Sequence, residues 1–193
     1  MKPFFNLLKS IDKITTLRYN YLTNILIPYL EDCKTVLDLG ASSGRLAKNI
    51  QDKLDIKIVG VDKHLQPERF IPIIKCDGKK LLFKNNSFDC VMIIDALHHD
   101  NNPQKIIEEA KRVTKKYILI KDHYWDNKVD IALLEFADYI GNKPYGIDLY
   151  YNFLNMKSWY ALIKKNNLTI VKSQKFRYNV LDYCKHVIFK LKK

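Results

Sequence analysis

The chain has 193 residues, of which 47% are hydrophobic and 28% are charged, and its formal net charge is +12. This length suits one domain that buries about 70% of its unfolded surface, and it is too short for two domains of ordinary size. No apolar run has the ~20 residues of a membrane span or the length of a secretory signal, so we expect a cytoplasmic chain with no stable membrane insertion. The four cysteines show no Cys-x-x-Cys spacing, so we expect reduced thiols and no metal site.

The N-terminal segment, residues 1–33, has the apolar spacing of an amphipathic helix. Leu22, Ile25 and Leu26 recur at intervals of three or four residues within residues 4–30, which predicts one or two helices. We expect Pro28 to kink or end the second.

Residues 36–46 follow with a pattern typical of a nucleoside-binding turn. They read as an apolar strand ending in Asp38, a turn with Gly40 and Gly44, and then a helix over 44–52. A dinucleotide-binding turn needs a second glycine that lets the backbone approach a pyrophosphate, and Ser42 stands at that position. Because Asp38 would also repel an anion, the segment favours a cofactor with positive charge.

Four further strands come next, three of them directly followed by acidic residues. Strand 56–61 leads to Asp62, strand 70–75 to Asp77 and Gly78, strand 88–94 to Asp95, and strand 117–121, after a helix over 103–114, to Asp122 and His123. Strands that alternate with helices form parallel sheets, and ligands bind outside the carboxyl ends of such strands. One cleft can therefore collect these side chains.

In this order and spacing, residues 34–123 resemble the class I S-adenosylmethionine-dependent methyltransferases, especially the small-molecule branch that includes the ubiquinone and menaquinone enzymes. The residues that carry the resemblance are Val36–Gly44, Asp62, Cys76–Gly78, Asn86–Asp89, Leu97–His99 and Glu109–Thr114. The chain departs from the family's pattern at two positions. Ser42 replaces the usual middle glycine, and His64 follows, by two positions, Asp62, the acid expected to bind the ribose.

The resemblance implies a role for each candidate residue in binding S-adenosylmethionine. Asp38, Gly40 and Gly44 would bind the methionine half, Asp62 the ribose hydroxyls, and Asp77 with Gly78 the adenine amino group. Ala41, Lys63 and Asp95 complete the expected set. Arg18 or Tyr19, in the N-terminal cover, could reach the methionine carboxylate; the alternative is a packing helix with Arg18 in solvent.

The segment 124–156 is rich in aromatic residues. It predicts a helix over about 128–140, in which Ala137 or Asp138 completes the apolar period, and a turn over 141–146. In methyltransferases of this type such an insertion is a substrate cap, and a helix that merely covers the sheet is the alternative.

Residues 157–193 carry ten Lys or Arg and one Asp, whereas 35–156 are nearly neutral. They predict a helix over 157–166 and two strands, 168–178 and 185–193, the last antiparallel. The interpretation that we favour is that these lysines solubilise exposed strands and discourage edge pairing. The second interpretation is attraction to RNA or to an acidic membrane.

Methyl transfer needs mainly positioning, and a histidine could remove a proton from the acceptor. The available bases are His98, His99 and His123. His123 beside Asp122 is the first choice and His98 the second, and a purely structural role stays open for each.

We therefore expect a Rossmann-like α/β fold with a seven-stranded, mostly parallel sheet over 1–193. The expected function is S-adenosylmethionine-dependent methyl transfer to oxygen or carbon of a small molecule. The Asn/Asp-Pro-Pro-Tyr and Pro-Cys motifs of enzymes that methylate nucleic-acid bases are absent. The alternatives are an RNA-directed methyltransferase that uses the basic region and a non-catalytic cofactor-binding module. The sequence does not predict the oligomeric state.

Overall fold

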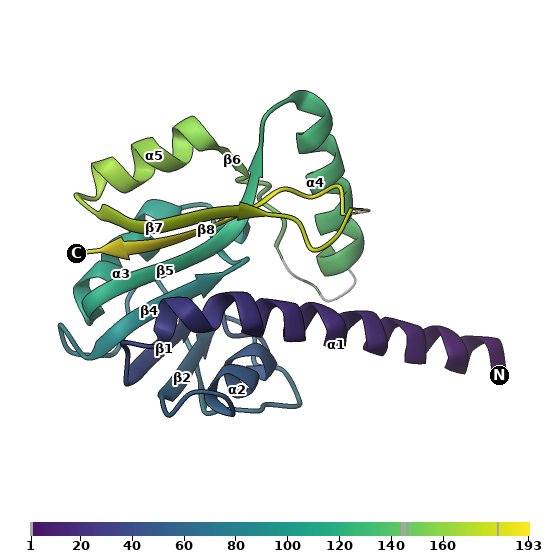
Figure 1. Cartoon of the computed structure of the whole chain (residues 1–193), viewed down its shortest axis with the longest axis horizontal. Helices are drawn as coiled ribbons and strands as arrows, with labels where there is room; N and C mark the ends of the chain where they lie inside the picture. Colours follow the sequence, from purple (N-terminus) through teal and green to yellow (C-terminus); the bar gives the residue numbers. More distant parts are fainter. Residues whose placement is uncertain (1, 144–145, 147, 181) are drawn as a thin grey trace.

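A mixed β-sheet with helices on both faces forms the centre of the chain (Figure 1). The computed structural model describes the backbone of residues 2–143, 146, 148–180 and 182–193, and the side chains of these residues from 16 onward. The helices are α1 (Lys2–Leu30), α2 (Arg45–Gln51), the 3-10 helix η1 (Leu97–His99), α3 (Pro103–Val113), α4 (Lys128–Asn142) and α5 (Met156–Lys165). The strands are β1 (Thr35–Leu39), β2 (Lys57–Asp62), β3 (Ile73–Lys75), β4 (Phe88–Ile94), β5 (Thr114–Trp125), β6 (Leu154–Asn155), β7 (Thr169–Phe176) and β8 (His186–Lys192).

The order of the strands confirms the predicted Rossmann-like fold. It runs β3-β2-β1-β4-β5-β8-β7, with the two-residue β6 paired to β5. The strands from β3 to β5 are parallel, and β8 is antiparallel to both β5 and β7. Since the order changes direction between β1 and β4, the carboxyl ends of these two strands border the crevice where such folds bind ligands.

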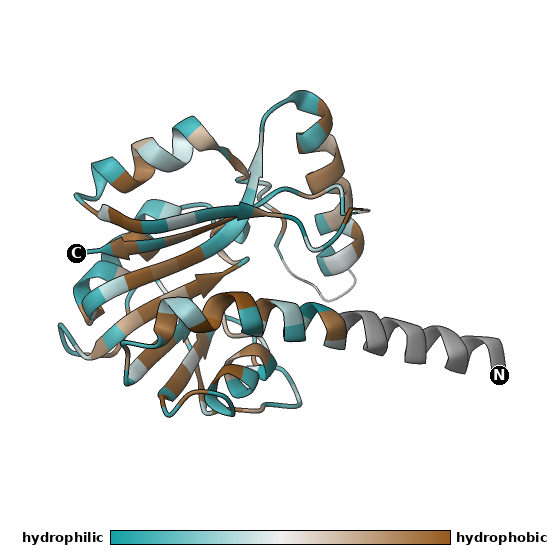
Figure 2. Cartoon of the chain, in the orientation of Figure 1, coloured by the Kyte–Doolittle hydropathy of each residue, from teal (hydrophilic) through white to brown (hydrophobic). Residues whose placement is uncertain are grey.

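Each face of the sheet is covered by helices that contribute apolar side chains. On one face Leu26 of α1 and Ile50 of α2 belong to a buried cluster, and on the other Ile107 of α3 and Trp159 of α5 belong to a second. The central strands are largely apolar, whereas the described helices contain both apolar and polar residues (Figure 2). None of the helices in the described part of the chain combines the length and the apolarity of a bilayer-spanning segment.

The fifth predicted strand is longer than expected. β5 continues to Trp125, so Asp122 and His123 lie inside the strand instead of after it. The physical reason is its pairing with β8, which reaches as far as His123 opposite His186. A polar stretch that reads as a loop becomes strand because a neighbouring chain segment completes its hydrogen bonds.

The third predicted strand and the N-terminal helix also differ from their predicted bounds. The third strand is reduced to β3, because Pro72 has no N–H to donate and the residues before it leave the ladder. α1 is one helix that includes Pro28 and ends two residues later, at Leu30, so the proline lies in its last turn and the helix does not continue far beyond it. Within the predicted turn at 141–146, positions 144 and 145 lie outside the described residues.

Candidate active site

A cavity of about 330 Å³ opens at the carboxyl edge of the parallel strands. It is lined by residues of α1, by the ends of β1, β2 and β4, and by the segments that follow them. Of the residues predicted to bind the cofactor, all except Gly44 lie in its wall: Arg18, Asp38, Gly40, Ala41, Asp62, Lys63, Asp77, Gly78 and Asp95. The topology thus gathers side chains that are up to 77 positions apart in the sequence.

The turn after β1 is shaped by glycine. Gly40 has a φ of 87°, and a Cβ on it would lie 2.6 Å from the Cβ of Ala96, so only glycine fits there. Gly44 does not reach the cavity. It precedes α2 with a φ of 74°, and a Cβ would lie 2.4 Å from Ile71. Gly44 is therefore required by its left-handed backbone and by its contact with Ile71, in the segment before β3. The backbone at Ser42 reaches the left-handed region, with a φ of 51°, without a glycine.

Asp62, the last residue of β2, is held in place by the backbone. One carboxylate oxygen accepts from the N–H of Ser42 at 2.7 Å and the other from the N–H of His64 at 2.8 Å. These contacts leave further lone pairs for a ligand. The backbone N–H at position 64 thus helps to fix the carboxylate of Asp62, a contact that does not involve the imidazole of His64.

Asp38 is a buried carboxyl group beside the turn. Burial and the nearby charge of Asp62 raise the pKa of Asp38 to about 7. A carboxyl group with such a pKa favours a positively charged neighbour, because a cation would stabilise its ionised form.

Asp95 lies between two cations at the end of β4. The Nζ of the fully buried Lys121 lies 2.6 Å from both carboxylate oxygens, and Nη2 of Arg18 lies 2.9 Å from Oδ2. Burial alone would raise the pKa of Asp95, but Lys121 and the other nearby cations hold it well below its usual range. Arg18 is thus paired with Asp95 and also donates to the hydroxyl of Tyr178 at 3.3 Å.

The three residues predicted to be catalytic lie together, behind the cavity wall. Nδ1 of His98 is 2.6 Å from Oδ1 of Asp122, and the same oxygen accepts from the backbone N–H of His123 at 2.7 Å. Neither His98 nor His123 lines the cavity, whereas the neighbouring His99 does. Burial works against charge on His98, but Asp122 and other carboxylates outweigh it and raise its pKa, whereas burial lowers the pKa of His123 to about 4.

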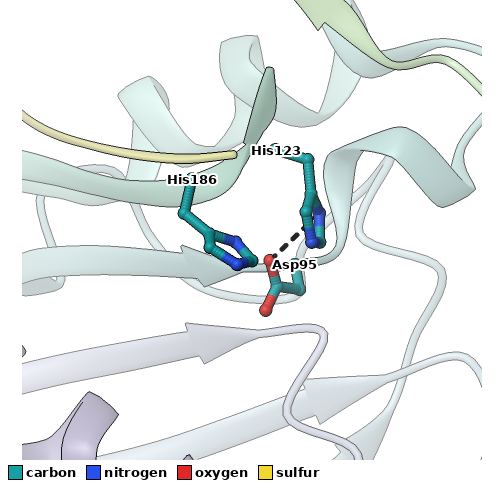
Figure 3. Close-up of side chains that lie close together, drawn as sticks. All are labelled: Asp95, His123 and His186. Atoms are coloured by element: carbon teal, nitrogen blue, oxygen red, sulfur yellow. Dashed lines mark ion pairs between the residues drawn. The ribbon is translucent and has the colours of Figure 1, made fainter. Parts of the chain in front are cut away.

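His123 and His186 point from β5 and β8 toward Asp95 (Figure 3). Nδ1 of His123 is 3.5 Å from Oδ1 of Asp95, and the two imidazole rings are 4.6 Å apart. His186 was not predicted, because only the pairing of β5 with β8 places it there.

Lys121 and Asp138 are further members of the site that the sequence did not single out. Lys121 follows an apolar run and reads as the end of a strand. Asp138 occupies an apolar position of the predicted helix at 128–140, and a buried acid in such a position is the signal that could have marked it.

Comparison with known proteins gives the same picture. Residues 37–117 match a family model described as a methyltransferase domain. An uncharacterised protein of Methanocaldococcus jannaschii is 28% identical over 152 residues, which are 76% of this chain and 70% of that protein.

Two similar solved structures are methyltransferases. A 1,6-didemethyltoxoflavin-N1-methyltransferase from Burkholderia thailandensis, bound to 1,6-didemethyltoxoflavin and S-adenosylhomocysteine, aligns with a TM-score of 0.68 at 16% identity over 100% of this chain and 89% of that chain. A methyltransferase from Thermotoga maritima that depends on S-adenosylmethionine aligns with a TM-score of 0.65 at 18% identity over 98% of both chains. Residues 37–117 therefore match a methyltransferase domain, and the chain as a whole has the fold of these S-adenosylmethionine-dependent methyltransferases.

Proposed function

We propose that this chain transfers the methyl group of S-adenosylmethionine to oxygen or carbon of a small-molecule acceptor. The observation that carries the proposal is the meeting of Asp38, Asp62 and the bend at Gly40 in one cavity wall. Two carboxylates next to a glycine bend suit a nucleoside that carries positive charge, and they disfavour a pyrophosphate. The Burkholderia neighbour binds S-adenosylhomocysteine, which supports the same ligand class here.

Different residues of the wall would bind different parts of this cofactor. Asp62, oriented by two backbone N–H groups, would accept hydrogen bonds from the ribose hydroxyls. Asp38 would stabilise the ammonium group of the methionine half, and Asp77 with Gly78 would receive the adenine amino group. Since Arg18 is already paired with Asp95, its contact with the methionine carboxylate would be shared with that ion pair.

The acceptor would enter beside α4, which reaches the cavity through Asn142. The chain's task is to hold the acceptor atom roughly 3–3.5 Å from the methyl carbon, in line with the leaving sulfur. A hydroxyl or an acidic carbon must also lose a proton. Among the candidate bases, His99 lies in the cavity wall, and the rings of His98 and His123 lie behind it.

A binding experiment tests the cofactor site. Because loss of a hydrogen bond to a charged group costs about 1.5–3 kcal/mol, Asp62→Ala should weaken S-adenosylmethionine binding by roughly 10- to 150-fold in calorimetric titration. Asp55→Ala is the matched control, since Asp55 is an exposed acid at the opposite end of β2. Unchanged affinity of the Asp62 variant would remove this residue from the site, and no uptake by the wild type at millimolar ligand would contradict the proposal.

A second experiment identifies the acceptor. The chain is incubated with methyl-labelled S-adenosylmethionine and a cell extract, and the labelled products are separated by size and by nuclease treatment. Label in a small organic molecule supports the proposal. Label in RNA would favour the RNA-directed alternative, and no transfer despite tight binding would favour a non-catalytic module.

A further inference from the structure

Beside the cavity, side chains from η1 and α4 form a compact group of potential metal ligands, the His98–His99–Asp138 cluster. Oδ1 of Asp138 is 3.6 Å from Nε2 of His99 and 3.9 Å from Nε2 of His98. Both distances exceed a hydrogen bond. Two ligands that lie about 2.0–2.2 Å from one tetrahedral ion are roughly 3.3–3.6 Å apart, so the spacing is close to that of ligands around a shared ion.

The cluster contains buried polar atoms that lack partners within the described residues. They include Oδ2 of Asp138 and Nδ1 of His99. The side chain of Asp138 is only 4% exposed, and its hydrogen bond comes from the amide of Asn142, 2.6 Å from Oδ1. A buried carboxylate supported by one neutral amide is unfavourable unless a cation compensates it.

His98 has the outer contact that metal-binding histidines usually have. Its Nδ1 donates to the buried carboxylate of Asp122, so Nε2, on the side of Asp138, is the nitrogen that a metal would bind in place of a proton. The ring of Phe153 stacks on that of His98 at a centroid distance of 4.7 Å and helps to fix its orientation.

A neighbouring group, Asp95 with His123 and His186, is less suited to a cation (Figure 3). The carboxylate of Asp95 is already paired with Lys121 and Arg18, and a divalent ion there would be repelled by both. In the described part of the chain, the ionic contacts of Asp138 involve only histidines.

We propose that His98, His99 and Asp138 bind one divalent transition-metal ion, such as Zn²⁺ or Fe²⁺, with an open position toward the cavity. Two imidazoles and one carboxylate with a free position are typical of catalytic metal sites. His99 belongs both to the cluster and to the cavity wall, so the open position is accessible to an acceptor.

The proposed ion implies a class of acceptor, and this part of the inference rests on the proposed function. An acceptor with a hydroxyl group would bind the metal through its oxygen, and the metal lowers the pKa of that group, so that its proton leaves to solvent. The oxygen then forms a bond to the methyl carbon, the carbon–sulfur bond breaks, and its electron pair remains on sulfur as a neutral thioether. The acceptor is therefore a molecule that can ligate a metal through oxygen.

Metal binding is tested directly on the full, untagged chain. After removal of metals with a chelator and dialysis, Zn²⁺ is titrated against a chromogenic competitor. We expect one tightly bound ion per chain and a loss of affinity of at least about 10- to 100-fold in Asp138→Asn, since even the loss of an outer partner of a metal ligand costs that much. Glu135→Gln, which changes another acid of α4 outside the cluster, should bind Zn²⁺ like the wild type. His99→Gln is a second ligand variant in case Asp138→Asn does not fold.

Absence of stoichiometric Zn²⁺ binding, or equal binding by both ligand variants and the wild type, would overturn the proposal. So would a loss of affinity in His186→Gln alone, since that would place the ion at Asp95. Calorimetry with S-adenosylmethionine is run in parallel. Failure of Zn²⁺ binding with intact cofactor binding contradicts only the metal site, and the reverse result contradicts only the proposed function.

Discussion

Asp38 combines burial with a position in the wall of the cavity. Burial and Asp62 raise its pKa to about 7, whereas an aspartate in an unfolded chain has a pKa of about 3.9. At pH 5 or 6 the folded, ligand-free protein therefore keeps a proton on Asp38 that the unfolded chain has already lost. A positively charged ligand would reverse this preference, because it stabilises the ionised carboxylate.

This difference predicts a pH-dependent stability. The contribution of Asp38 is fully present below about pH 4 and is lost as the pH rises to about 7, because ionisation is easier in the unfolded chain. Denaturant unfolding of the wild type and of Asp38→Asn should therefore diverge, with the variant gaining relative stability from pH 4 to pH 7 and the difference levelling off above. Parallel curves for the two proteins over this range would show that the pKa of Asp38 is not raised.

At the scale of the element, α4 is the helix that carries Asp138 to the histidines of η1. Its start is fixed by a capping box. The side chain of Asn127 accepts from the backbone N–H groups of Val129 and Asp130, and the Asp130 side chain accepts from the N–H of Asn127. Lys185, just before β8, also pairs with Asp130 at 2.7 Å, which joins the helix to the sheet.

Removing this cap should weaken the helix. Asn127 is exposed, so its replacement by alanine leaves no cavity, and the expected loss is about 0.5–2 kcal/mol of unfolding free energy. Urea unfolding followed by circular dichroism measures it. Lys128→Ala, at the next and equally exposed position, is the control. Identical midpoints for the two variants would show that the capping box does not contribute.

At the scale of the whole molecule, the positive charge is concentrated in β7, β8 and α5. β7 is an edge strand with exposed side chains, so its lysines also discourage pairing with another chain. Several of the basic side chains already have partners within the fold. Lys172 lies over the ring of Tyr29, Lys185 is paired with Asp126 and Asp130, and Lys190 with Asp32.

This arrangement predicts weak binding to RNA. A surface that neutralises six or more phosphates loses about 10³- to 10⁵-fold in affinity between 50 and 200 mM salt. We expect filter binding of bulk tRNA to be weak already at low salt, because paired lysines release few counterions. Tight retention at low salt that falls steeply with added salt would contradict this prediction and favour the RNA-directed function.

Sequence patterns alone predict the order of the main elements and four of the acids that line the cavity, Asp38, Asp62, Asp77 and Asp95. Hydrophobic periodicity marks strands and helices locally, and the acids Asp62, Asp77 and Asp95 follow or end apolar strands whose carboxyl ends must share one edge of a parallel sheet. Those positions depend on local pattern and on a general rule of topology. For this reason these positions could be predicted from the sequence alone.

Which side chains meet behind the cavity wall depends on the packing of distant segments. His186 faces Asp95 because β8 pairs with β5 in one particular register, and Asp138 reaches η1 because α4 folds back over the end of the sheet. Lys121 and His123 face Asp95 while Asp122 faces His98, since alternate residues of a strand point to opposite sides. Register and docking arise from contacts between distant segments, and no local property of the sequence encodes them.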